Sequence, residues 1–359
     1  IASDVPTRFM LREIEHFLKN QNFFPSVAEQ RTQAKHFLEL MQLEAGLIVE
    51  RGTDESGQLL YGFMHRTFQE YFAALDVYER YQQEEDSTII SEFLKEHLHD
   101  PHWREVILLL LGKLKRKPAT IQLRNILEGK SRLSTYTDIV QQDLFFTCNC
   151  LAEEIVVENE LAVFIVSHIS DLVKNSPFPS QHTEAFEALA LLMQTRHYAD
   201  LGRKELRDLV TQEIIPDIPT RIRAARTLYL SSLPKSEEQQ QAVQVLLNLA
   251  QRSDISFEES LLAARTLYEH SYAESEELQQ AAQMLLDLAR RPDISFKQSL
   301  LAIEILYWNS PDVSEERQQA IKLLLGLARR PDISFEQVGQ ITRILYEFGS
   351  TDSEERQQA

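Results

Sequence analysis

The feature that most constrains the fold of this chain is an internal repeat of 39 residues in its C-terminal part. The motif AARTLY at Ala224–Tyr229 recurs at Ala263–Tyr268, and looser copies follow at Ala302–Tyr307 and Ile341–Tyr346. A second motif, Ser-Glu-Glu, keeps the same step and begins at Ser236, Ser275, Ser314 and Ser353. A fixed period of about 20–50 residues is typical of chains that stack copies of one structural unit. We therefore expect residues 216–359 to form a repeat array that offers a binding surface.

Each repeat contains the signals for two helices. The first helix begins at a serine that is followed three residues later by Glu or Gln, which predicts capping boxes at Ser256, Ser295 and Ser334. The second begins at Ser-Glu-Glu, where two carboxylates meet the positive end of the helix dipole, and Pro292 ends one copy. A hairpin of this length resembles HEAT and armadillo repeats and lacks the tetratricopeptide pattern. The expected architecture is an α-solenoid of HEAT-like hairpins.

Some residues of the repeats have more than one interpretation. The tyrosine that ends each AARTLY-type motif could belong to an aromatic ladder that binds a ligand, or could pack between hairpins. The arginine pairs at 290–291 and 329–330 could line an anion-binding surface, or could cap helix ends. Ahead of the clear copies, residues 183–215 predict a degenerate hairpin with an apolar face formed by Phe186, Leu189 and Leu192.

The N-terminal part predicts a different fold. Apolar residues at helical spacing indicate helices over 7–19 and 26–43. The apolar face of the first helix carries Met10, Ile14, Phe17 and Leu18, and that of the second carries Ala34, Phe37, Leu38 and Met41. Short strands over 46–50 and 59–64 flank a turn, and a helix over 67–83 follows, which together describe a winged helix. We expect a mainly all-α chain: a winged-helix-like domain (1–85) with a short β-hairpin, a helical linker with degenerate repeats (86–215), and the array (216–359).

Three N-terminal segments, Gly62–Ala74 (GFMHRTFQEYFAA), Asp100–Ile107 (DPHWREVI) and Gly46–Arg51 (GLIVER), resemble parts of NACHT-type signalling NTPases of the STAND class, especially bacterial and cyanobacterial-like members. Gly62–Ala74 is similar to the segment at the end of their winged helix. Asp100–Ile107 is similar to a segment that follows, and Gly46–Arg51 resembles their Gly-Leu-Leu strand. The likeness covers roughly residues 7–112, and the segments occur in the order found in the family.

The resemblance implies a switch protein that binds ATP or GTP, with ATP and ADP as the expected nucleotides of the full-length protein. In such a protein an effector precedes the NTPase core and C-terminal repeats sense a trigger. By motif match, His65 would contact the phosphate of bound nucleotide and hold the inactive state, and a histidine can donate such a hydrogen bond. His65 could instead cap the strand end or order Gln69 and Glu70. The implied roles are signal transduction and antiviral defence, with oligomerisation on activation as a further option.

The chain itself lacks the nucleotide-binding core of that family. A P-loop needs Gly-x-x-x-x-Gly-Lys-Ser/Thr after a strand, whereas Gly129-Lys130-Ser131 follows a predicted helix and has Arg124 at the first glycine position. The chain begins at Ile1 and stops within a repeat, so we expect a piece of a longer protein with its NTPase domain upstream. We expect no enzyme activity and no bound cofactor in these residues. The alternative function is a HEAT-like scaffold for protein–protein interaction, without nucleotide.

Composition limits the partners. The net charge of −18 disfavours phosphate backbones, and the helix before the wing mixes Arg31 and Lys35 with several glutamates, so we do not expect nucleic acid to be a partner. No apolar run approaches the roughly 20 residues that span a bilayer. The two cysteines, Cys148 and Cys150, cannot readily pair with each other, which indicates a reducing cytoplasm. We therefore expect a cytoplasmic protein whose repeats bind a protein trigger or partner.

One further cluster could bind a metal. His97, His99 and His102 lie close together in the sequence, with Asp100 between them. Pro101 prevents a single helix from presenting all three on one face, and no matching pair of ligands follows. We expect no metal site here.

Overall fold

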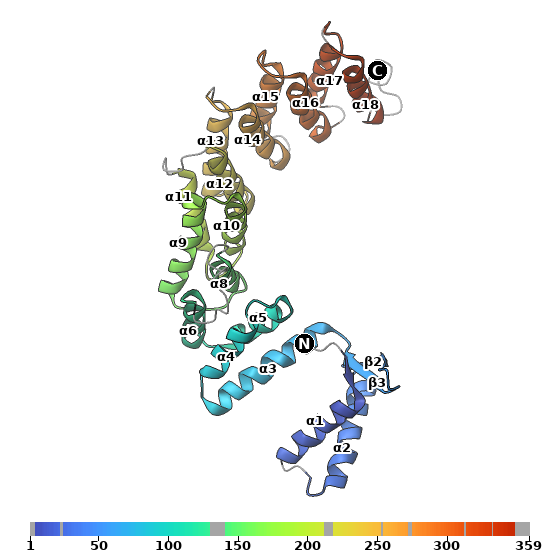
Figure 1. Ribbon diagram of the computed structural model, residues 1–359. Helices are drawn as coiled ribbons and strands as arrows, with labels where there is room; N and C mark the ends of the chain where they lie inside the picture. Colours follow the sequence, from blue (N-terminus) through green and yellow to red (C-terminus); the bar gives the residue numbers. More distant parts are fainter. Residues whose placement is uncertain are drawn as a thin grey trace. The chain divides into compact units, whose positions relative to one another are not determined.

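The computed structural model describes residues 4–21, 24–129, 141–211, 218–252, 254–271, 275–311, 314–331 and 333–348, with only the backbone of 347 and 348. Over these residues the protein is mainly helical, with a small antiparallel sheet near the N-terminus (Figure 1). The chain forms two compact units, Ile1–Ala162 and Val163–Ala359. The boundary between them falls inside the segment 86–215. Ser353 and the pair Lys130-Ser131 lie outside the described residues.

The winged-helix-like part begins the first unit, and its elements occur in the predicted order. Helices α1 (Thr7–Asn20) and α2 (Val27–Glu39) are followed by the π-helical turn η1 (Leu40–Glu44). Strands β2 (Ile48–Thr53) and β3 (Leu59–Phe63) form the wing, and α3 (Arg66–Glu84) follows. A strand that the sequence analysis did not predict, β1 (Val5–Pro6), pairs with β3, so the sheet has the order β1-β3-β2.

The core of this part is small. Leu38, Ile48 and Tyr61 are buried, and Met10 and Ile14 are among the side chains that pack against them. Two residues of the predicted apolar faces lie outside this core, since Phe17 is 56% exposed and Phe37 is 48% exposed.

The rest of the first unit is helical. Its described elements are α4 (Thr88–His97), the 3-10 turn η2 (Pro101–Trp103), α5 (Arg104–Lys113), α6 (Arg116–Leu127), α8 (Gln142–Ala152) and the start of α9 (Asn159–Asn175). Helix α3 packs on α4 and α5, while α6 packs on α4 and α8. In α5, Val106, Ile107, Leu110 and Leu111 are each inaccessible to solvent. The exposed face of this helix also carries an apolar residue, Leu109, which is 37% exposed, and this explains why the sequence of α5 shows little amphipathic period.

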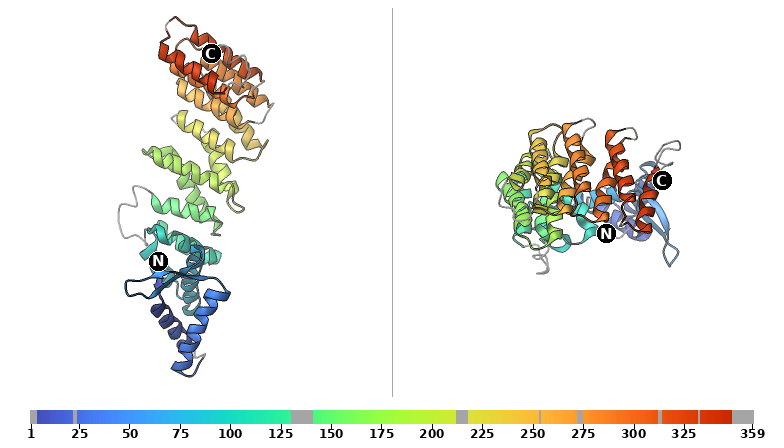
Figure 2. Two further views of the ribbon diagram at one scale, coloured as in Figure 1. Left: turned by 90° about the vertical axis from the view of Figure 1, so that its right-hand side faces the viewer. Right: turned by 90° about the horizontal axis from the view of Figure 1, so that it is seen from above.

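The second unit contains the repeat array. Its elements are α10 (Pro179–Leu192), α11 (Ala199–Thr211), α12 (Ile218–Ser231), α13 (Glu237–Ala250), α14 (Phe257–His270), α15 (Glu276–Arg290), α16 (Phe296–Asn309), α17 (Glu315–Ala328) and α18 (Phe335–Phe348). Each helix packs on its sequence neighbour, and from α10 to α17 helices two positions apart also pack on each other. We call α10, α12, α14 and α16 the first row and α11, α13, α15 and α17 the second row. Figures 1 and 2 show the successive hairpins of this α-solenoid.

The predicted helix starts are confirmed by hydrogen bonds. Ser256 and Ser295 each form a complete capping box with Glu259 and Gln298. At the last copy, the Gln337 amide donates to Ser334 Oγ and the Gln337 side chain accepts from the Ser334 amide. The second helices start at serine caps with two glutamates in the first turn. The early hairpin is also confirmed, since Phe186, Leu189 and Leu192 of α10 are buried against its neighbours.

The repeated tyrosines hold neighbouring hairpins together. The Tyr229 hydroxyl donates to the carbonyl of His270 at 3.0 Å, at the end of the next first-row helix. One repeat later, the hydroxyls of Tyr268 and Ser310 are 2.5 Å apart. Tyr229, Tyr268 and Tyr307 are all at least 95% buried. Of the two interpretations, packing between hairpins is therefore correct for these three tyrosines.

One glycine marks a close approach between helices in the array. Gly202 of α11 faces the end of α10, where an added Cβ would lie 3.0 Å from the Leu189 carbonyl oxygen and 3.1 Å from Leu192 Cβ. Gly326 of α17 has open space instead, because a Cβ added there would have nothing within 4 Å. The first glycine is thus required by packing, whereas the second is not.

Within the described ranges, none of the helices combines the length and the apolar character that a membrane span needs.

Candidate functional site

His65 lies at the junction between the wing and α3. The Met64 amide donates to the Leu47 carbonyl, which fixes the end of β3, and His65 then serves as the N-cap residue of α3 in an extended conformation. The His65 side chain makes no capping hydrogen bond and is exposed, with its ring centroid 6.1 Å from that of Phe68. The first turn of α3 also contains no acidic residue. The junction therefore presents an exposed imidazole beside backbone N–H groups of a helix N-terminus.

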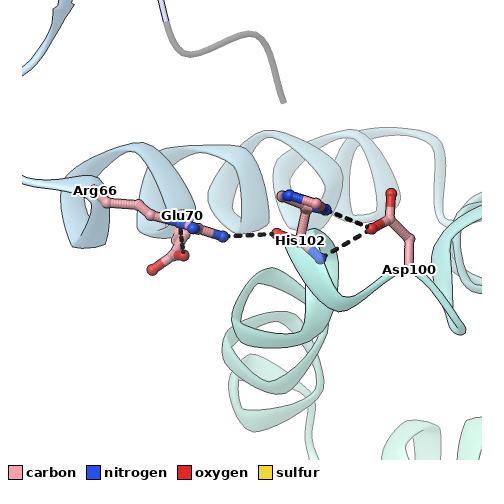
Figure 3. A network of polar contacts seen from close by, with 4 residues as sticks. All are labelled: Arg66, Glu70, Asp100 and His102. Carbon is pink, nitrogen blue, oxygen red and sulfur yellow. Dashed lines mark hydrogen bonds and ion pairs between the residues drawn. The ribbon is translucent and has the colours of Figure 1, made fainter.

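The neighbours of His65 are bound to each other, as Figure 3 shows. Arg66 Nε donates to Glu70 Oε1 at 2.7 Å, and the Glu70 side chain is only 8% exposed. The other end of the guanidinium reaches the His102 carbonyl at 3.4 Å, and His102 in turn donates its amide to Asp100. These contacts bring together the two segments 62–74 and 100–107, which the sequence analysis singled out separately. Since Glu70 is held by Arg66, His65 is not needed to order it.

Exposed aromatic side chains surround this junction. Phe68, Tyr71 and Phe72 are each about 40% exposed on α3, and Met64 is 46% exposed. The ring of Phe72 stacks on Phe63 at 5.9 Å. The Tyr71 ring carries the Lys113 ammonium 4.5 Å from its centroid, a cation–π contact that joins α3 to α5. A patch of this kind on a folded domain is typical of an interaction surface.

The three histidines of the suggested metal cluster take different partners. His97 stacks on the Trp103 ring at 4.2 Å, and His99 lies 3.6 Å from the buried carboxylate of Asp143. His102 is paired with Asp100, which accepts from the His102 amide. This last contact lowers the pKa of Asp100 below its usual value. No group of three or more metal-binding side chains converges among the residues that the structure covers.

The two cysteines are core residues of α8. Cys148 and Cys150 are both almost completely buried, and both are free thiols. Burial raises the pKa of Cys148 to about 12, so the thiolate needed for nucleophilic or redox chemistry is disfavoured at neutral pH.

The array presents two different surfaces, which the sequence analysis did not distinguish. The second-row surface is polar: in each of its later helices a glutamine donates to the glutamate one turn before it, as in the pairs Gln241–Glu237, Gln280–Glu276 and Gln319–Glu315. The first-row surface carries exposed arginine, leucine and tryptophan side chains. The sequence holds a signal for this first-row surface. Positions 223, 262 and 301, which are 39 residues apart, hold Arg, Leu and Leu.

The arginine pair at 290–291 is held by nearby carboxylates. Arg291 makes a forked contact with Asp293, and the Arg252–Asp254 pair occupies the equivalent position one repeat earlier. Arg290 lies 3.9 Å from Asp287. These ion pairs at the helix ends favour the capping interpretation for Arg290 and Arg291 over an open anion site.

Comparison with known proteins adds little. No protein-family model and no curated protein matches the chain. Among solved structures, the chain is similar to one described as the crystal structure of an engineered protein, from the Northeast Structural Genomics Consortium. The identity is 18%, the match covers 82% of this chain and 84% of that one, and the TM-score is 0.24. A TM-score this low supports no conclusion about function.

Proposed function

We propose that this chain is a protein-recognition module in which the repeat array binds a trigger or partner protein. The observation that carries the proposal is the α-solenoid itself, because stacked hairpins present a continuous surface to a partner. The catalytic chemistry considered for the cysteines has no support, since both thiols are buried. Free buried thiols also support the cytoplasmic location that we include in the proposal.

Site-specific photo-cross-linking in the source cells tests this function. A photoreactive amino acid would replace exposed residues on both rows, at Leu301 and at Gln283, and at Glu92 of α4 as the matched position outside the array. We expect a discrete cross-linked protein from at least one array position and none from Glu92. If the array positions yield only diffuse background, the repeats do not act as a recognition surface.

A second function is supported by the geometry around His65. We propose that the chain is also the regulatory portion of a NACHT-type nucleotide switch, in which His65 contacts a phosphate of ADP or ATP held by a separate NTPase domain. An exposed imidazole beside uncapped amides at the start of α3 suits an anion, because both donate hydrogen bonds and the helix dipole attracts negative charge. Partner binding by the array would then shift the equilibrium between closed and open states.

The His65→Ala variant of the complete protein tests this second function. Loss of the phosphate contact should raise basal activity and speed ADP release, on the order of tenfold if one charge-assisted hydrogen bond worth about 1.5 kcal/mol is lost. His36→Ala, which removes an exposed histidine from α2, is the matched control and should change neither. Unchanged ADP release and basal activity in His65→Ala would reject the nucleotide switch. The chain would then be a protein-binding scaffold without nucleotide involvement.

A further inference from the structure

The exposed apolar side chains of the array lie unevenly. Leu230 of α12 is 47% exposed, and Leu301 and Trp308 of α16 are 43% and 50% exposed. All three belong to the first row. By contrast, every described large apolar side chain of α13, α15 and α17 is buried or half-buried. Exposed apolar side chains that gather on one surface indicate where a partner binds.

One helix of the first row, α12, reverses the charge of the chain locally. Helix α12 carries Arg221, Arg223 and Arg226 and contains no acidic residue, in a protein whose net charge is −18. Arg223 and Arg226 are exposed, and neither forms an ion pair with a carboxylate of the described residues. Their positive potential is therefore available to a ligand.

A hollow of about 200 Å³ lies between α12 and α14, where these two properties meet. Leu262 supplies an apolar wall, and Arg226 and Arg265 occupy equivalent positions of adjacent repeats. The charge of Arg265 is offset by Glu269, whose carboxylate accepts from Arg265 Nε at 2.7 Å. Arg226 has no such partner among the described residues, so the hollow keeps a positive charge beside an apolar wall.

A larger hollow on the second row, about 560 Å³, has the opposite character. Its lining includes Glu237, Gln240, Gln244 and Glu277, and no basic residue. The amide of Gln241 is already bound to Glu237. This hollow is acidic, so it would repel an acidic ligand.

We propose that the first-row surface formed by Arg223, Arg226, Leu262, Leu301 and Trp308 binds an acidic peptide segment of a partner protein, with an aliphatic or aromatic side chain as its anchor. The proposal rests on the recognition function proposed above and specifies its partner. A carboxylate of the peptide can accept two parallel hydrogen bonds from the Arg226 guanidinium, while the anchor packs on Leu262 in the hollow. Leu301 and Trp308 extend the apolar contact along the next first-row helix, and a half-exposed tryptophan is a typical interface residue.

The charge pattern favours a peptide over a nucleic acid. Along the first row the basic residues are interrupted by Glu258, Glu269 and Glu304. A phosphate backbone with one charge per nucleotide would meet these carboxylates, whereas a peptide can place single acidic residues opposite Arg223 and Arg226. The exposed leucines of the first row can likewise pack against apolar side chains of a peptide.

A random peptide library displayed on phage and selected on the full chain tests the proposal. We expect the selected peptides to be enriched in Asp and Glu, to share a Leu, Phe or Trp, and to bind more weakly as salt is raised. Arg226→Glu should weaken these peptides on the order of tenfold, which corresponds to about 1.4 kcal/mol. Leu262→Ala and Trp308→Ala should also weaken them.

Lys322→Glu is the matched control, because it makes the same charge change at an exposed second-row position of α17. We expect it to leave peptide affinity unchanged. Selection of peptides without acidic residues, loss of binding in Lys322→Glu but not in Arg226→Glu, or no binders above background would each overturn the proposal. So would binding of a fluorescent RNA or DNA oligonucleotide that Arg226→Glu abolishes while acidic peptides fail to bind. Cross-links from the second row alone would leave the recognition function standing and reject this surface.

Discussion

The variant Leu306→Ala should lower the free energy of unfolding of the array by about 2–5 kcal/mol, the range for removing a fully buried leucine side chain. Leu306 has no exposed surface, and its helix α16 packs on α15 and α17. A repeat array is stabilised by contacts between adjacent units, so the loss should be concentrated around α15–α17. Urea unfolding would measure the total loss, and hydrogen exchange of backbone amides would locate it.

Leu301→Ala is the matched control on the same helix. Leu301 is 43% exposed, so we expect its truncation to change the free energy of unfolding by no more than about 0.5 kcal/mol. The same substitution should weaken binding of acidic peptides, because Leu301 belongs to the proposed first-row surface. Equal destabilisation by the two variants would show that α16 is not buried as described.

The second large effect is expected at Gly202, where the Leu variant should lower the free energy of unfolding by about 3 kcal/mol through overpacking. Even a Cβ would lie 3.0 Å from the Leu189 carbonyl oxygen, and a backbone atom cannot move aside as a flexible side chain can. Helices α10 and α11 would have to separate. Faster hydrogen exchange in both helices and a lower urea midpoint would confirm this.

Gly326→Leu provides the control for helix propensity. Gly326 is exposed in α17 and a Cβ added to it would have nothing within 4 Å, so replacing glycine in a helix should stabilise by up to about 0.8 kcal/mol. We thus expect the same substitution to lower the free energy of unfolding at Gly202 and to raise it at Gly326. A stable Gly202→Leu variant would contradict the close approach of α10 and α11.

Several features were predictable from the sequence because they depend on residues close together in the chain. A capping box joins residues three apart, so Ser256 and Ser295 could be assigned as helix starts without knowing the fold. The wing was predictable for the same reason, since a short turn connects β2 to β3. Strand β1 was missed because its pairing, Val5 with Tyr61, spans most of the domain and two residues carry no periodic signal.

The sequence by itself determined the 39-residue period, the two helices of each repeat and the capping residue that starts each one. The tertiary structure decided which side chains these helices bury and which they present. It showed Tyr268 bonded to Ser310, more than one repeat away, and it left Phe17 exposed although it shares an apolar stripe with Met10. It also showed that the first row exposes apolar and basic side chains, whereas the second row exposes polar ones. Burial is decided by surfaces that meet from distant parts of the chain, and helical periodicity alone gives no information about which surfaces meet.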